Sequence, residues 1–131
     1  MRRLLAAALI ALALAVPSAH IAAQAPPAPA AQAEPRIPAK AMAHILAGHG
    51  PDGAAPGAGK YAPGTTEATI RFLITEALAH GTPVPDSHFR PATLYDYRFP
   101  HLIGTTIDGA PTNRIRVVVG HDGAVVTAYP R

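Results

Sequence analysis

The sequence contains no cysteine, and it has almost no serine. Without cysteine the chain cannot form disulfide bonds, so a folded domain must depend on a hydrophobic core. Beyond residue 23 the only serine is Ser87, which is not in a Gly-x-Ser-x-Gly sequence of the kind that surrounds many serine nucleophiles. These absences argue against a disulfide-stabilised domain and against a serine hydrolase.

The sequence also lacks an apolar run with the full length of a membrane-spanning helix. The run from Leu4 to Val16 is shorter than the roughly 18 residues of a membrane span, and it suits the apolar segment of a signal peptide. Arg2 and Arg3 precede it, and the small residue Ala23 follows at a suitable cleavage point. We therefore predict a signal peptide over residues 1–23 and a secreted or periplasmic mature chain with no membrane segment. An uncleaved membrane anchor is the alternative.

An excess of charge is also missing. The full sequence has a formal charge of +3, from 11 basic and 8 acidic residues. Cleavage would remove Arg2 and Arg3, which leaves nine basic residues against eight acidic ones. Such a balance produces no strong bulk field, so binding of nucleic acid would depend on where individual positive groups lie.

The remaining chain divides into a tether and one small domain. Residues 24–36 are rich in alanine and proline, a composition that favours extended, solvated chain. Residues 37–131 are then predicted to form one domain.

The domain begins with a predicted short helix. Pro38 suits a first helical turn, the strong helix formers Ala39–Ala47 follow, and Gly48 is expected to end the helix. A long loop of glycine and proline then extends over residues 48–59. Loops of this length in small domains are usually functional or mobile.

A second helix has the clearest pattern in the chain. Thr65 or Thr66 can cap its start, and Gly81 ends it. Its apolar residues have the spacing of an amphipathic helix that lies across a sheet, and they are Ile70, Leu73, Ile74, Ala77 and Leu78.

The second half of the domain has the pattern of antiparallel strands. After an irregular segment at 82–91, we predict strands at 94–99 and 101–107, a turn at 108–111 and a C-terminal hairpin around Gly120–Gly123. The fold class is therefore α+β, with two N-terminal helices packed on a three- to four-stranded antiparallel sheet.

The predicted hairpin has one apolar and one polar face. Ile115, Val117 and Val119 alternate with Arg114, Arg116 and Val118, and Ala124, Val126 and Ala128 alternate with Val125, Thr127 and Tyr129. We expect the polar face to present Arg114, Arg116, Thr127 and Tyr129.

Two histidines and a lysine border the glycine-rich loop: His44, His49 and Lys60. Two imidazoles and a cation suffice for metal-free cleavage of RNA, in which the 2′-hydroxyl is the nucleophile. One histidine removes its proton, the other protonates the leaving 5′-oxygen, and the lysine offsets charge on the phosphorane.

Two other interpretations of these residues stay open. By their spacing alone, His44 can also be a helix-end residue and His49 a solvated loop residue, neither with a catalytic role. A metal site of His44, His49 and Asp52 is a further alternative, although its spacing matches no common metal motif.

The segments that flank the loop resemble a known family. His44-Ile45-Leu46-Ala47-Gly48, the loop with His49 and Lys60, and the ending Val126-Thr127-Ala128-Tyr129-Pro130 are similar to bacterial EndoU-type ribonuclease toxins. The resemblance implies a barnase/EndoU-like fold. It also implies that His44, His49 and Lys60 are catalytic, and that Thr127 and Tyr129 hold uridine and phosphate. We add Arg116, on the same strand face, to the predicted substrate-binding residues.

Together these observations predict an exported bacterial toxin-like endoribonuclease that needs no metal or cofactor. It would cleave uridine-containing RNA to 2′,3′-cyclic phosphate ends, and an immunity protein is an expected partner. A non-catalytic secreted or periplasmic binding module on the same scaffold is the alternative function.

Overall fold

The computed structural model describes residues 34–86 and 91–131. The predicted signal peptide, most of the predicted tether and Ser87 lie outside these residues. The described helices are α1 (Ala39–His49) and α2 (Glu67–His80). The described strands are β1 (Lys60–Tyr61), β2 (Thr82–Asp86), β3 (Ala92–Arg98), β4 (Gly104–Thr105), β5 (Pro111–Thr112), β6 (Arg114–Gly120) and β7 (Val125–Pro130).

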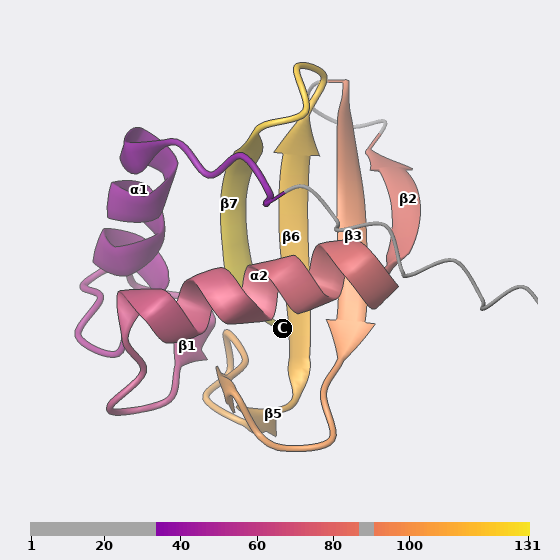
Figure 1. Cartoon of the computed structure of the whole chain (residues 1–131). Helices are drawn as coiled ribbons and strands as arrows, with labels where there is room; N and C mark the ends of the chain where they lie inside the picture. The colour runs from indigo at the N-terminus through magenta and orange to yellow at the C-terminus, as the bar shows by residue number, and fades with distance from the viewer. Residues whose placement is uncertain (1–33, 87–90) are drawn as a thin grey trace, which may run out of the picture. The chain divides into compact units, whose positions relative to one another are not determined.

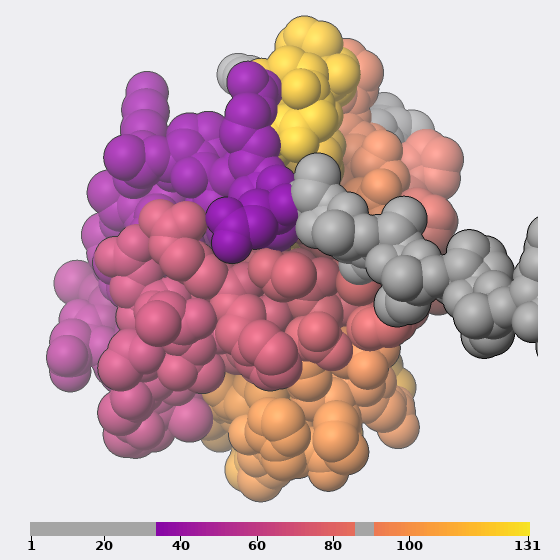
Figure 2. All heavy atoms as spheres, viewed as in Figure 1, coloured from indigo at the N-terminus to yellow at the C-terminus, as the bar shows by residue number. Residues whose placement is uncertain are grey.

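The strands form two antiparallel sheets. The larger has the order β2-β3-β6-β7, and the smaller, made of two-residue strands, has the order β1-β4-β5. Helix α2 packs on β3 and β6, and α1 packs beside β7 (Figure 1). In the space-filling view, atoms of α2 cover the front of the larger sheet, and those of α1 lie to its left (Figure 2). The predicted α+β class is thus confirmed, although the helices are not at the N-terminus of the chain, because α1 begins only at Ala39.

The core lies between α2 and the larger sheet. Its helical part is the predicted stripe, with Ile70, Leu73, Ile74 and Ala77 buried and Leu78 partly buried. Its sheet part contains Ile115 and Val117, with Val119 partly buried, as the alternation of β6 predicts. Thr66 caps α2 by accepting a hydrogen bond from the backbone N–H of Thr69, and Gly81 follows the last turn.

The predicted hairpin is present, but its second strand changes phase. Gly123 has a φ of 78°, as a tight Asp-Gly turn requires. A β-bulge between Val118 and Val119 shifts the register, so Val125 is buried and Val126 is 52% exposed. The prediction that Val126 shares a face with Ala128 is therefore wrong, because the bulge interrupts strict alternation.

Two predictions for the strands upstream are also wrong. Residues 82–86, expected to be irregular, form the edge strand β2, where Pro83 and Pro85 are tolerated because an edge strand has one unpaired side. The strand predicted over 101–107 is reduced to the two residues of β4, which pair with β1 and β5 in the smaller sheet.

Helix α1 is longer than its sequence indicates. Gly48 does not end it, because the helix continues through His49 and the backbone N–H of Gly50 bonds to the carbonyl oxygens of Ile45 and Leu46. His49 is consequently the last residue of a helix and not part of the loop. Within the described residues, no helix has the length and apolar character that a membrane span needs.

Candidate functional site

The packing of α1 beside β7 brings three of the predicted residues together. The ring of His49 stacks on that of Tyr129, with centroids 5.1 Å apart and planes inclined by 25°. The ring of His44 meets His49 edge-on, at 6.1 Å and 80°. Because Ile45 fixes α1 in the core, both histidines are held at the edge of the larger sheet.

A backbone carbonyl fixes the orientation and the tautomer of His49. Nδ1 lies 2.9 Å from the carbonyl oxygen of Gly59, which can only accept a hydrogen bond. Nδ1 must therefore carry the proton, and in the neutral ring Nε2 is left with a free lone pair. Burial lowers the pKa of His49, the charges of His44 and Lys60 lower it further, and the bond to Gly59 opposes this only in part. The neutral ring, with a basic Nε2, is thus favoured near neutral pH.

The lowered pKa of His49 predicts a loss of stability in mild acid. Between its folded pKa and its ordinary value of 6.5, the unfolded chain binds more protons than the folded one. The free energy of unfolding should therefore fall as pH drops below about 6.5, and this contribution should level off below the folded pKa. Urea unfolding from pH 5 to 7 would measure it. His49→Gln should flatten that part of the pH dependence, and an unchanged dependence in this variant would contradict the assignment.

Lys60 lies near the histidines, but its ammonium group is hydrogen-bonded to backbone carbonyls. Nζ donates hydrogen bonds to the carbonyl oxygens of Gly48 and of Ala55, the latter at 2.8 Å. A positive group at this place also suits the carbonyl end of α1. Lys60 thus joins the end of the helix to the glycine-rich loop, and it affects His49 through its charge.

The loop itself is packed tightly where it passes β7. A Cβ atom on Gly59 would lie 1.9 Å from the carbonyl oxygen of Pro130, so backbone would have to move. Gly59→Ala should therefore destabilise the fold by about 1–3 kcal/mol and misplace the carbonyl that holds His49.

Gly48 provides a matched control for this substitution. A Cβ there would meet only Ala55, at 4.0 Å. Gly48→Ala, within a helix, should stabilise the protein by about 0.5–1 kcal/mol. Denaturant unfolding would give the free energy of unfolding of both variants. Equal changes in that free energy would contradict the close packing at Gly59.

The polar face of the sheet places Arg116 beside Tyr129. The two residues pair across β6 and β7, and Arg116 donates two hydrogen bonds of 2.7 Å to the carboxylate of Asp96 on β3. Burial alone would lower the pKa of Arg116, but Asp96 and the Tyr129 side chain outweigh it and raise that pKa. The aspartate and the tyrosine therefore hold a permanent cation next to the ring that stacks on His49.

Thr127 lies on the same face with an unused hydroxyl. Its Oγ1 is buried and has no hydrogen-bond partner among the described residues. Thr127 and His44 line one hollow, of about 450 Å³, which also includes Lys40 and Val126. A second hollow, of about 370 Å³, is lined by His49, Tyr129 and the glycine-rich segment 57–59. The histidine pair thus lies between two hollows, each of which contains one predicted substrate-binding residue.

Asp52 is not part of this arrangement. Within residues 34–86 and 91–131, no group of three or more His, Asp or Glu side chains is placed to hold one metal ion. The alternative metal set of His44, His49 and Asp52 is therefore not assembled.

Sequence reasoning missed three contributors to the site: Gly59, Asp96 and Arg131. The carbonyl of Gly59 holds His49, and Asp96 binds both Arg116 and Arg131. For Asp96 a signal existed, because it alternates with Tyr95 and Tyr97 on its strand and so belongs to the polar face. For the other two residues the contacts depend on tertiary structure alone.

Comparison with protein-family models, with curated proteins and with solved structures gave no match.

Proposed function

We propose that this protein is an exported, metal-independent endoribonuclease that cleaves RNA through its 2′-hydroxyl group. The observation that carries the proposal is the chain of contacts from His44 to His49 to Tyr129, with rings 6.1 and 5.1 Å apart. Two imidazoles beside a polar strand face are what general acid–base cleavage of RNA needs, and RNA supplies its own nucleophile.

The two histidines have different roles in this proposal. Neutral His49 removes the proton of the 2′-hydroxyl through Nε2, because Nδ1 is committed to Gly59. The 2′-oxygen then attacks phosphorus, and the bond to the 5′-oxygen breaks. Exposed His44 donates a proton to that oxygen. The products are a 2′,3′-cyclic phosphate and a free 5′-hydroxyl.

The remaining side chains position the substrate and stabilise its charge. The cation of Arg116, next to Tyr129, faces negative charge that develops on the phosphorane. Thr127 lines the hollow beside His44, and its buried hydroxyl, which has no partner among the described residues, would hydrogen-bond to a base there after the side chain rotates. Lys60 contributes its charge and positions the loop, since its ammonium hydrogens are directed to backbone carbonyls.

The resemblance to EndoU-type ribonuclease toxins supports the same proposal. It is carried by the residues from His44 to Gly48 and by the strand that ends in Thr127, Tyr129 and Pro130, and these segments lie side by side as α1 and β7. On this basis we also propose a barnase/EndoU-like fold, uridine-containing RNA as substrate, a secreted or periplasmic location and an immunity protein as partner.

One observation favours the alternative of a non-catalytic binding module. The ammonium group of Lys60, which the resemblance makes catalytic, binds two backbone carbonyls, that of Gly48 at the end of α1 and that of Ala55 in the loop. A module of this kind would bind an anionic partner on the polar face without cleaving it.

A chimeric oligonucleotide separates these two functions. We expect a DNA strand that contains a single uridine ribonucleotide to be cut only after that residue, in the presence of excess chelator, because only that position has a 2′-hydroxyl. Denaturing electrophoresis would show one cleavage position. Cleavage of the all-DNA control, or complete loss of cutting on chelation, would contradict the proposed mechanism.

A further inference from the structure

A group of arginines lies at one end of the polar face, beyond the histidine pair. Arg98 and Arg114 are directly opposite each other on β3 and β6, and Arg131 follows β7. The backbone N–H of Arg131 bonds to the carbonyl of Arg114, so the three residues are neighbours. They line a hollow of about 220 Å³ together with Asp96, Tyr97 and Ile115.

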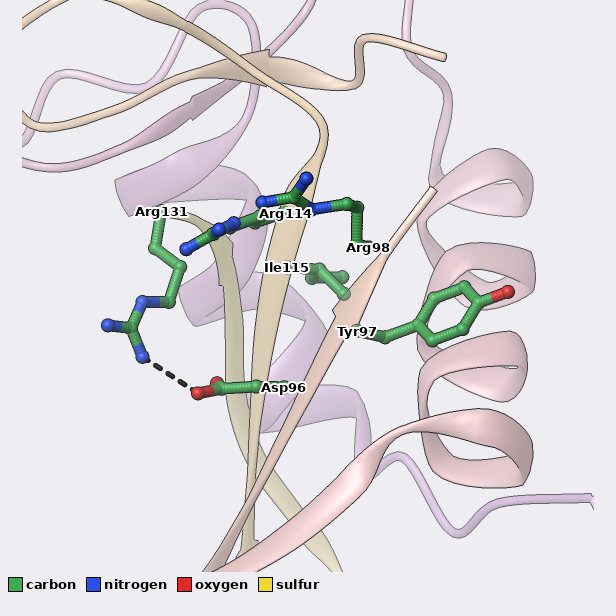
Figure 3. A pocket seen from close by; sticks show the side chains of 6 residues that line it. All are labelled: Asp96, Tyr97, Arg98, Arg114, Ile115 and Arg131. Atoms are coloured by element: carbon green, nitrogen blue, oxygen red, sulfur yellow. Dashed lines mark hydrogen bonds and ion pairs between the residues drawn. The ribbon is translucent and has the colours of Figure 1, made fainter. Parts of the chain in front are cut away.

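The close-up view shows how these side chains are arranged. Tyr97 points toward a helix, whereas Asp96 points to the opposite side of the sheet, where Arg131 reaches it (Figure 3). Arg131 donates to Asp96 at 2.8 Å, and Asp96 also binds Arg116. Arg98 and Arg114 lie at the upper end of the same hollow (Figure 3).

The cluster has more positive than negative charge. The four arginines (Arg98, Arg114, Arg116 and Arg131) lie near one carboxylate, that of Asp96, which pairs with Arg116 and Arg131 only, so three positive side-chain charges are left unbalanced. Among the described residues, no carboxylate pairs with Arg98 or Arg114. Like charges directly opposite each other on paired strands are destabilising. The placement of these two arginines thus has a cost that an anionic ligand would remove.

The position of Arg131 connects this hollow to the proposed catalytic site. Arg131 lines both the arginine hollow and the hollow that contains His49 and Tyr129. At about 220 Å³, the arginine hollow is smaller than the roughly 300–1,000 Å³ of drug-sized ligand sites. It therefore suits a single small anionic group, such as one phosphate, better than a base with its sugar.

We infer that Arg98, Arg114 and Arg131 bind a second, uncleaved phosphate of the nucleic-acid strand whose neighbouring phosphate lies at the histidine pair. The inference rests on the proposed ribonuclease function. Guanidinium groups bind phosphate oxygens in a fixed, bidentate geometry, and such contacts position a strand without reading its sequence. The protein would thereby favour substrates that have more than one phosphate.

Binding of a strand that cannot be cleaved tests this site independently of catalysis. The full chain would be titrated with a short fluorescent single-stranded DNA, which lacks the 2′-hydroxyl, at several salt concentrations. We expect the double variant Arg98→Gln/Arg114→Gln to bind about tenfold more weakly, a change of about 1.4 kcal/mol. The slope of log affinity against log salt should also fall by about 0.7 for the lost phosphate contact.

Arg71→Gln is the matched control. Arg71 is exposed on α2 and pairs with Glu67, away from the polar face, and its substitution removes one positive charge. This control should leave the affinity and the salt slope unchanged. The inference would be overturned if Arg71→Gln weakened binding as much as the single variants Arg98→Gln or Arg114→Gln do. Wild-type binding in the double variant would also overturn it.

Cleavage of substrates of two lengths provides a second measurement. A dinucleoside monophosphate has one phosphate, so the double variant should cleave it with wild-type kcat/KM. A tetranucleotide should lose about tenfold in kcat/KM, and an equal loss on both substrates would overturn the inference. If the wild type cleaves neither, the proposed function fails while the DNA-binding result still decides whether the phosphate site exists.

Discussion

His49→Ala is expected to reduce the rate of RNA cleavage by about 10²–10⁴-fold, the usual contribution of one general acid or base. His44→Ala should have an effect in the same range. The wild-type rate should show a bell-shaped dependence on pH, because one imidazole must be neutral and the other protonated. Since burial lowers the pKa of His49, we expect the acidic limb of the bell to lie below pH 6.5.

Two further variants separate catalysis from structure. His49→Asn keeps a side-chain N–H that can reach the carbonyl of Gly59 but has no basic nitrogen, so it should retain the fold and remain inactive. His80 is an exposed residue at the end of α2 and lies outside the site, so the His80→Ala variant should cleave RNA at the wild-type rate. Activity in the double variant His44→Ala/His49→Ala would contradict the assigned roles.

The substrate-binding residues should respond differently. Thr127→Ala and Tyr129→Phe remove hydroxyl groups that we assign to positioning, so they should raise KM with a smaller effect at saturating RNA. A loss in kcat as large as that of the histidine variants would indicate that these hydroxyls act in the transition state instead.

Leu73→Ala is expected to destabilise the protein by about 2–5 kcal/mol. Leu73 is only 3% exposed and lies in the core between α2 and the larger sheet. With no disulfide to compensate, this loss is a large share of the roughly 5–15 kcal/mol that holds a small domain folded. Urea unfolding at neutral pH would measure it.

Phe72 is the matched control on the same helix. Its side chain is 57% exposed, so Phe72→Ala should change the free energy of unfolding by no more than about 0.5 kcal/mol. If Leu73→Ala cost less than about 1 kcal/mol, the packing of α2 on the sheet would be described incorrectly.

The parts of the fold that the sequence predicts well are those with local causes. Helix α2 has an apolar stripe, a threonine cap and a terminal glycine, all within one short segment. The hairpin has a glycine with positive φ between two β-branched runs. Each element could be recognised without knowledge of the rest of the molecule.

The parts that it predicts poorly depend on pairing between distant segments. Residues 82–86 have two prolines and read as irregular, yet β3 provides a partner for an edge strand. The bulge at Val118 and Val119 has no local signal, so the phase change at Val125 could not be anticipated. Gly48 is a residue type that commonly ends helices, but the helix is capped at Gly50, which is recognised only from its hydrogen bonds.

In the candidate site, too, the sequence predicts some features, and others are visible only in the folded structure. The sequence singles out His44, His49 and Tyr129, and the fold brings these three together. The sequence does not reveal that the ammonium of Lys60 binds the backbone carbonyls of Gly48 and Ala55, because those contacts depend on the path of the loop. Asp96 pairs with Arg116 only through the register of β3 and β6, which alternation alone cannot determine.

The central claim concerns the reaction itself, and the chemical form of the product ends tests it most directly. Wild-type protein would be incubated with a uridine-containing RNA in excess chelator, and the fragments analysed by mass spectrometry. We predict fragments that end in a 2′,3′-cyclic phosphate and fragments that begin with a 5′-hydroxyl. Intact RNA, or fragments that end in a 3′-hydroxyl, would contradict the account.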